Sequence, residues 1–116
     1  MTTTNRTAKI AALNDALRRE PGTGEHGRIV MTRGVSEFGI PFTMEVLAKL
    51  KVFDAFTKDN DPYGEHDFGS FDLAGHTLLW KVDYYEKASD LTAGAETPEN
   101  AETTDRLLTI MLAEEY

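Results

Sequence analysis

Cysteine is absent from the 116 residues of this chain. Its absence excludes disulfide bonds, thiolate metal sites and thiol nucleophiles. Long apolar runs are missing too, and none approaches the ~20 residues that a membrane-spanning helix needs. The first twenty residues also lack the continuous apolar segment of a secretory signal peptide. We therefore expect a cytoplasmic protein that has no membrane partner.

Basic residues are scarce in the second half of the chain. Residues 53–116 contain four Lys or Arg against fifteen Asp or Glu, a net charge of −11. Residues 1–52 contain eight against five, a net charge of +3, and the two halves sum to the −8 of the whole chain. Such asymmetry indicates an electrostatic partner. The alternative is an acidic surface that only keeps a small protein soluble and monomeric.

The remaining composition is typical of a soluble globular protein. Hydrophobic residues make up 41% of the chain and charged residues 28%, as in folded rather than disordered proteins. The length suits one hydrophobic core, and no internal repeat or linker divides the chain. We expect a single α+β domain over residues 1–116.

Two segments have the apolar spacing of amphipathic helices. The first covers residues 5–19, where Asp15 and Arg19 are spaced for an i,i+4 ion pair. The second covers residues 42–56, whose apolar residues share one face and therefore predict core packing. Between them, the glycine-rich residues 21–27 do not fit a nucleotide-binding loop, because no strand precedes the glycines and no Gly-Lys-Ser/Thr follows.

The rest of the regular structure reads as strands. Residues 67–73 and 76–86 alternate polar and apolar side chains around Ala74-Gly75, which predicts a β-hairpin. Residues 28–34 favour a further strand. Residues 106–116 fit a strand or a helix, and we favour a strand because the sheet needs an edge partner. The expected fold is α+β, an antiparallel sheet of about four strands with two helices packed on one face.

The densest group of potential ligands lies in "KDNDPYGEHDFG", residues 58–69. The segment does not fit an EF-hand calcium loop, because Tyr63 and Ser70 stand where oxygen ligands are required. A looser divalent-metal site, in a metal-binding protein or a metal-dependent enzyme, is one alternative. Its ligands would be Asp59, Asp61, Glu65, His66 and Asp67.

A structural connector is the other alternative for this segment. Its Asp and Asn side chains would cap backbone groups, while Pro62 and Gly64 would set the turn. A catalytic role has less support, because His66 beside a carboxylate could orient as a general base but no nucleophile is recognisable. No catalytic residue is assigned, and the pattern favours a non-enzymatic protein without a cofactor.

The acidic half of the chain favours an interaction surface for a basic protein. Charge complementarity gives such a contact fast association and a steep dependence on salt. Direct binding of nucleic acid is not expected, because Trp80, Tyr84 and Tyr85 lie in acidic surroundings that repel phosphates. The predicted surface consists of Asp59, Asp61, Glu65, Asp67, Asp83, Glu86 and Asp90.

Three motifs, "NDPYGEHDFG", "WKVDYY" and the terminal "LTIMLAEEY", resemble in order and spacing those of a family of small bacterial proteins known as a domain of unknown function. The resemblance extends over roughly residues 8–116. It implies a context rather than an activity: members resemble cargo of plasmids and integrative elements, often beside genes that counter host defence. Together with the acidic half of the chain, this context favours as partner a nucleic-acid-binding component of a defence system, which the protein would inhibit or modulate.

Overall fold

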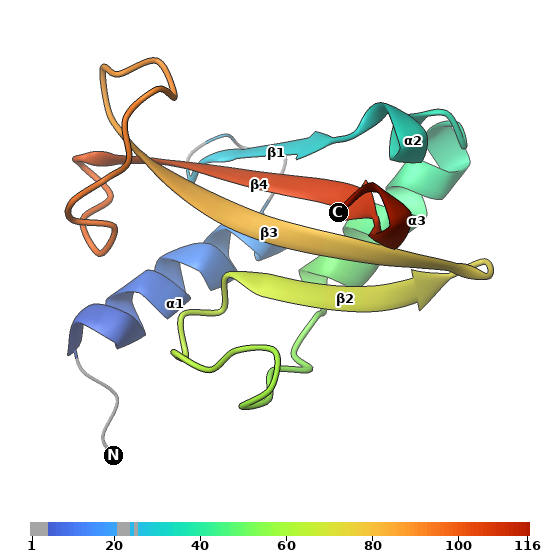
Figure 1. The fold of residues 1–116 in the computed structure, drawn as a ribbon, viewed down its shortest axis with the longest axis horizontal. Coiled ribbons are helices and arrows are strands. Elements are labelled where there is room, and N and C mark those ends of the chain that lie inside the picture. The colour runs from blue at the N-terminus through green and yellow to red at the C-terminus, as the bar shows by residue number, and fades with distance from the viewer. Residues whose placement is uncertain (1–4, 21–23, 25) are drawn as a thin grey trace.

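The chain folds into a four-stranded sheet with its helices packed against it (Figure 1). The computed structural model describes residues 5–20, 24 and 26–116. The predicted α+β class is confirmed. In chain order the elements are α1 (Asn5–Arg19), β1 (Arg28–Met31), α2 (Arg33–Ser36), α3 (Ile40–Lys51), β2 (Phe68–Leu73), β3 (His76–Glu86), β4 (Thr104–Leu112) and the 3₁₀-helix η1 (Ala113–Glu115).

The strand order across the sheet is β1-β4-β3-β2. β3 pairs antiparallel with β2 and with β4, as predicted. The prediction of a purely antiparallel sheet is wrong for the remaining pair, because β1 runs parallel to β4, with Met31 opposite Ile110. A parallel neighbour requires a long crossover connection, and α2, α3 and the whole β2–β3 hairpin separate β1 from β4 in the chain.

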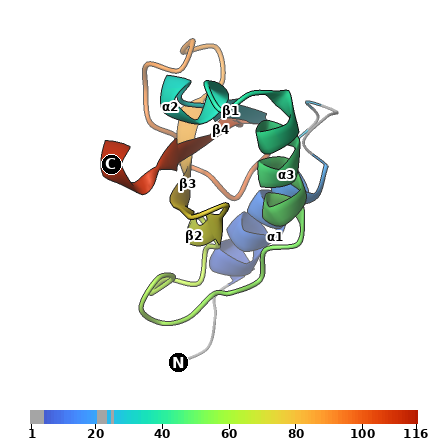
Figure 2. The same ribbon diagram turned by 90° about the vertical axis from the view of Figure 1, so that its right-hand side faces the viewer.

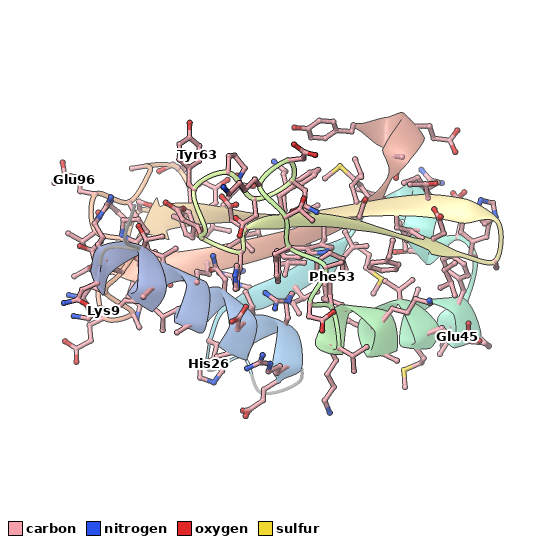
Figure 3. All side chains as sticks on the ribbon, turned by 90° about the horizontal axis from the view of Figure 1, so that it is seen from below. Lys9, His26, Glu45, Phe53, Tyr63 and Glu96 are labelled. Carbon is pink, nitrogen blue, oxygen red and sulfur yellow. The ribbon has the colours of Figure 1, made fainter. Side chains whose placement is uncertain are left out.

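Both long helices, α1 and α3, cover the same face of the sheet, as Figure 2 and Figure 3 show. One row of residues on that face crosses all four strands and carries Trp80 at its centre, 0% exposed. The buried core between helices and sheet comprises Leu17, Val35, Val46, Leu50, Leu78, Trp80, Val82, Leu108, Ile110 and Leu112.

Within residues 5–20, 24 and 26–116, no long helix covers the opposite face of the sheet (Figure 2). Because neighbouring residues of a strand point to opposite faces, this open face carries the residues that alternate with the core set. We call it the open face and define it by Val30, Phe68, Leu79, Lys81, Asp83, Tyr85, Leu107, Thr109 and Met111.

The two predicted helices are present. The first, α1, has the predicted bounds, whereas α3 begins two residues earlier than predicted and ends at Lys51 instead of Phe56. Phe53 and Phe56 leave the helix yet still reach the core, with ring centroids 5.4 and 6.1 Å from that of Trp80. Among the described residues, no helix is long and apolar enough to cross a membrane.

The predicted hairpin is confirmed. Ala74 and Gly75 have φ angles of 52° and 82°, and positive φ at both central residues is the signature of a type I′ turn. The ambiguous C-terminal segment forms a strand, as favoured, up to Leu112. The strand predicted for residues 28–34 ends at Met31, because α2 begins at Arg33. Of the glycine-rich segment 21–27, residues 21–23 and 25 lie outside the described residues.

Candidate functional site

The segment singled out in the sequence forms most of the connecting loop, residues 57–67, which joins α3 to β2. Asn60 organises its first turn, because its side chain donates to the carbonyl of Ala55 at 2.8 Å and accepts the backbone N–H of Thr57 at 2.9 Å. The tip of the loop carries Tyr63, which is 81% exposed and points away from the helices (Figure 3).

Asp61 closes the second half of the connecting loop. Only 8% of this residue is exposed. Its Oδ1 accepts the backbone N–H of His66 at 3.1 Å, and its Oδ2 lies 3.7 Å from His66 Nε2. Gly64 and His66 both have positive φ, 74° and 57°, so the carboxylate stabilises a tight turn in which the backbone adopts left-handed conformations. The connector role expected for this aspartate fits that geometry.

His66 ties the connecting loop to α1. Its Nδ1 lies 2.9 Å from Asp15 Oδ1, and the same oxygen accepts a hydrogen bond from Arg18 Nη2 at 2.7 Å. The pair Asp15–Arg18 replaces the i,i+4 pair with Arg19 that the sequence suggested. Asp15 thus lies within hydrogen-bond distance of Nδ1, whereas Asp61 lies beyond hydrogen-bond distance of Nε2.

Arg18 is buried beneath this contact, with 1% of its surface exposed. Its Cζ lies 5.0 Å from the ring centroid of Phe56 and 5.1 Å from that of Trp80. Guanidinium groups pack favourably on aromatic faces. Burial lowers the pKa of Arg18, while the bond to Asp15 opposes that shift. A charged residue of α1 thus forms part of the core beneath the connecting loop.

A second polar contact fixes Glu65. The Tyr84 hydroxyl donates to Glu65 Oε1 at 3.3 Å, and Asn14 Nδ2 donates to the Tyr84 oxygen at 2.8 Å and to the backbone carbonyl of Glu65 at 3.0 Å. Asn14 Oδ1 in turn accepts Arg106 Nε at 2.9 Å. Burial raises the pKa of Tyr84, so its hydroxyl stays protonated and remains a donor at neutral pH.

Asp67 is a carboxylate in this region whose pKa is raised by its surroundings. Burial raises its pKa, and the negative charges of Glu65, Asp61 and Asp83 raise it further. Asp83 has a cation beside it, Lys81 Nζ at 3.0 Å. Among the described residues, no cation forms an ion pair with Asp67.

The predicted ligands do not converge on one point. Asp61 and His66 meet, Glu65 turns to Tyr84, and Asp59 is exposed at the start of the loop. Within the part of the chain that the structure describes, no group of three or more His, Asp and Glu side chains is placed to hold a metal ion. The metal alternative therefore stays a prediction with no geometric support from these residues.

The other predicted surface residues lie on β3 and just beyond it. Asp83 is half-buried on the open face beside Lys81, and Glu86 Oε1 accepts the backbone N–H of Glu96 at 2.9 Å. Asp90 is exposed in the β3–β4 connection, with a φ of 53°. These three carboxylates lie at or beyond the end of the strand that carries Tyr84.

Sequence reasoning missed the contribution of α1. Asn14 and Arg18 are 0% and 1% exposed and lie four residues apart, in line with the buried Ile10. Polar residues at i+4 and i+8 from an apolar core position were the available signal, since a buried polar side chain requires a partner. The partner itself could not be predicted from the sequence, because it lies in the connecting loop some fifty residues later in the chain.

Comparison with protein families finds a match. The family model described as Protein of unknown function (DUF3768) matches residues 31–115, which include the connecting loop and three of the four strands. α1 lies outside the matched range, although its side chains hold the loop. Comparison with curated proteins and with solved structures finds no match.

Proposed function

The chain belongs to the family described as Protein of unknown function (DUF3768), and we propose from its own geometry that it is a non-catalytic module that binds a basic protein. The predicted residue Asp61 is buried and bonded to His66, so it is left out of the binding surface. The proposed acidic surface consists of Asp59, Glu65, Asp67, Asp83, Glu86 and Asp90.

The observation that carries the proposal is the crowding of carboxylates around Asp67. Burial and three neighbouring acids, Glu65, Asp61 and Asp83, raise its pKa. Like charges held together in partly buried positions lower the stability of a fold. A lysine or arginine from a partner would neutralise this cluster, so binding would recover stability that the free protein lacks.

Two exposed tyrosines outside the residues that define the open face support the proposal with aromatic contact area. Tyr63 and Tyr116 are 81% and 78% exposed, and the Tyr116 ring lies 6.2 Å from that of Phe68. Tyrosine is enriched at protein interfaces because it offers apolar area together with a polar hydroxyl. An aromatic centre beside a charged rim is the usual composition of such a contact.

The context implied by the sequence motifs suggests the partner. That context, cargo of mobile elements beside genes that counter host defence, points to a component of host defence. We infer that the target is a nucleic-acid-binding defence protein whose basic surface the acidic surface occupies. Electrostatic steering would give rapid association that weakens with salt.

The test begins with recovery of partners from host cells by the tagged full-length protein, at about 50 mM and 500 mM salt. A variant carrying Asp67→Asn, Asp83→Asn and Glu86→Gln removes three charges from the acidic surface. The matched control carries Glu45→Gln, Asp54→Asn and Glu114→Gln, which are exposed and lie outside it. Each recovered partner is then purified and titrated calorimetrically against all three proteins.

The expected result is a basic partner whose affinity falls about tenfold or more in the first variant and much less in the control. Its affinity for the unmodified protein should also fall as salt rises. Equal losses of affinity in both variants would mean that binding depends on the overall charge of the protein and not on the acidic surface. Recovery of no basic partner, or affinity that does not change with salt, would defeat the proposal.

A further inference from the structure

A cavity of about 160 Å³ lies at the end of the sheet where β1 and β4 begin and β3 ends. This is the left-hand end of the sheet in Figure 1. Of the described residues that line it, the charged ones are Arg28, Lys87, Arg106 and Asp105, and His26 contributes an imidazole. Among the described lining residues, three permanent cations thus stand against one carboxylate.

This concentration of cations is unusual for a chain with a net charge of −8. Lys87 and Arg106 are two of the four basic residues among positions 53–116. Within the described residues, neither they nor Arg28 forms an ion pair, whereas Arg6, Arg18, Arg33 and Lys81 each do. Among the described residues, no carboxylate therefore lies within ion-pair distance of these three cations.

Arg106 shows most clearly that a counter-charge is missing. Only 3% of the residue is exposed. Its Nε donates to Asn14 Oδ1 at 2.9 Å, its Nη2 donates to the carbonyl of Pro98, and its Cζ lies 5.2 Å from the ring centroid of Tyr84. All of these partners are uncharged. Burying a charge without an opposite charge in contact with it lowers the stability of a fold, and an anion in the adjoining cavity would offset that cost.

Gly27 allows the wall of the cavity to form. A Cβ at this position would lie 2.7 Å from the backbone oxygen of Arg106 and 2.9 Å from its Cβ. The φ of Gly27 is also +140°, which side chains of L-residues rarely adopt. The chain entering β1 can therefore lie directly against β4 only with glycine here, and the next residue, Arg28, pairs with Leu107, the neighbour of Arg106 in the chain.

We propose that this cavity is a binding site for a phosphoryl group. Guanidinium groups bind tetrahedral oxyanions through several hydrogen bonds and lysine adds a point charge, so the lining suits a phosphate dianion. The volume equals that of about five water molecules, enough for one phosphoryl group and its nearest waters but too small for a nucleoside. Binding relies on side chains of several elements, so it is unrelated to the nucleotide-binding loop that the glycines of residues 21–27 failed to match.

The test uses the full chain and inorganic phosphate, with chloride at equal ionic strength as the reference. Saturable stabilisation against heat by phosphate, matched by heat release in calorimetry, is expected. Arg28→Gln and Lys87→Gln change exposed residues and should each weaken phosphate binding about tenfold. Lys49→Gln and Lys58→Gln remove the same charge from exposed positions away from the cavity and should leave it unchanged.

A second arm replaces inorganic phosphate by phenyl phosphate. Comparable affinity would assign the site to the phosphoryl end of a larger molecule, whereas binding of inorganic phosphate alone would assign it to the free ion. The triple variant of the acidic surface should keep its affinity for phosphate, so this proposal and the proposed function fail separately. Stabilisation no greater than that by chloride, or equal weakening in the Lys49 and Lys58 variants, would overturn the phosphoryl site.

Discussion

The imidazole of His66 lies flat on the phenyl ring of Phe56, with centroids 4.0 Å apart and planes 3° from parallel. The same imidazole contacts Asp15 on α1 through Nδ1, at 2.9 Å. One side chain therefore joins three parts of the molecule: the N-terminal helix, the segment after α3 and the connecting loop. The loop that carries three residues of the proposed acidic surface is therefore anchored at its base.

Replacing His66 by asparagine should release this anchor while keeping the backbone. Asparagine tolerates the positive φ of 57° at this position, but it cannot stack on Phe56 or reproduce the contact with Asp15. We expect the free energy of unfolding to fall by about 1–3 kcal/mol. Urea denaturation followed by the fluorescence of Trp80 measures it. His26→Asn is the control and should cost less than about 0.5 kcal/mol; equal losses would mean that His66 anchors nothing.

Local features of the sequence were enough to predict part of this fold. Alternating polar and apolar residues on both sides of Ala74-Gly75 were enough to predict the hairpin, and apolar spacing was enough to predict α1. The parallel pairing of β1 with β4 depends instead on where the chain returns after more than seventy residues. No local pattern encodes such a return, so the expected antiparallel sheet was wrong at that edge.

The candidate site shows the same division between local and distant information. The turn residues of the connecting loop were recognisable, and the structure uses Asn60 and Asp61 as connectors. The partner of His66 is 51 residues distant along the chain, and the burial of Arg18 depends on rings from two other elements. Charge counting likewise found the acidic half but could not reveal that Arg106 is buried within it.

Gly69 on β2 should not tolerate even a methyl group as its side chain. A Cβ there would lie 2.5 Å from Trp80 Nε1 and 2.6 Å from Phe53 Cζ, so both rings would have to move. Because rings packed in a core cannot shift freely, Gly69→Ala should lower the free energy of unfolding by about 1–3 kcal/mol. Near-ultraviolet circular dichroism should also report a changed environment for Trp80.

Ser70→Ala is the matched control for this change. The serine follows directly on the same strand, its side chain is exposed on the other side of the sheet, and its loss should change the free energy of unfolding by less than about 0.5 kcal/mol. If Gly69→Ala proves as stable as Ser70→Ala, the close packing of Trp80 and Phe53 over the strand is not as described.

Asp67→Asn should stabilise the protein at neutral pH. Burial and neighbouring acids raise the pKa of Asp67 above its ordinary value of 3.8. The folded state therefore favours the protonated form, so this group's contribution to stability is greatest below pH 3.8 and is lost as pH rises through the folded-state pKa. Asparagine cannot ionise, so its advantage should grow from pH 3 to pH 7, reaching about 0.5 kcal/mol for this half-exposed position.

Urea denaturation of both proteins across that pH range measures the difference. Asp54→Asn, at an exposed position, controls for the loss of one negative charge. The substitution should also weaken binding of the basic partner, so that stability and binding change in opposite directions. A variant that is less stable at pH 7 would show that Asp67 makes a favourable contact in the free protein, contrary to the crowding on which the proposed function rests.

Glu115 should show the opposite dependence on pH, because its carboxylate joins η1 to the end of β1. Its Oε1 accepts the Thr32 hydroxyl at 2.7 Å and the backbone N–H of Leu112 at 2.7 Å. These bonds, the Thr32 hydroxyl foremost, lower the pKa of Glu115 below its ordinary value of 4.5. Its contribution to stability is therefore present above pH 4.5 and is lost as pH falls through the folded-state pKa.

Glu115→Gln removes this charge while keeping an oxygen acceptor. The variant should be less stable than the unmodified protein at pH 7, and the two should converge as the pH approaches 3, because Glu115 of the unmodified protein then also becomes uncharged. Denaturation at matched pH values measures the gap, with Glu114→Gln at the neighbouring exposed position as the control. A gap that persists unchanged at low pH would mean that the acceptor geometry, rather than the negative charge, holds η1 against β1.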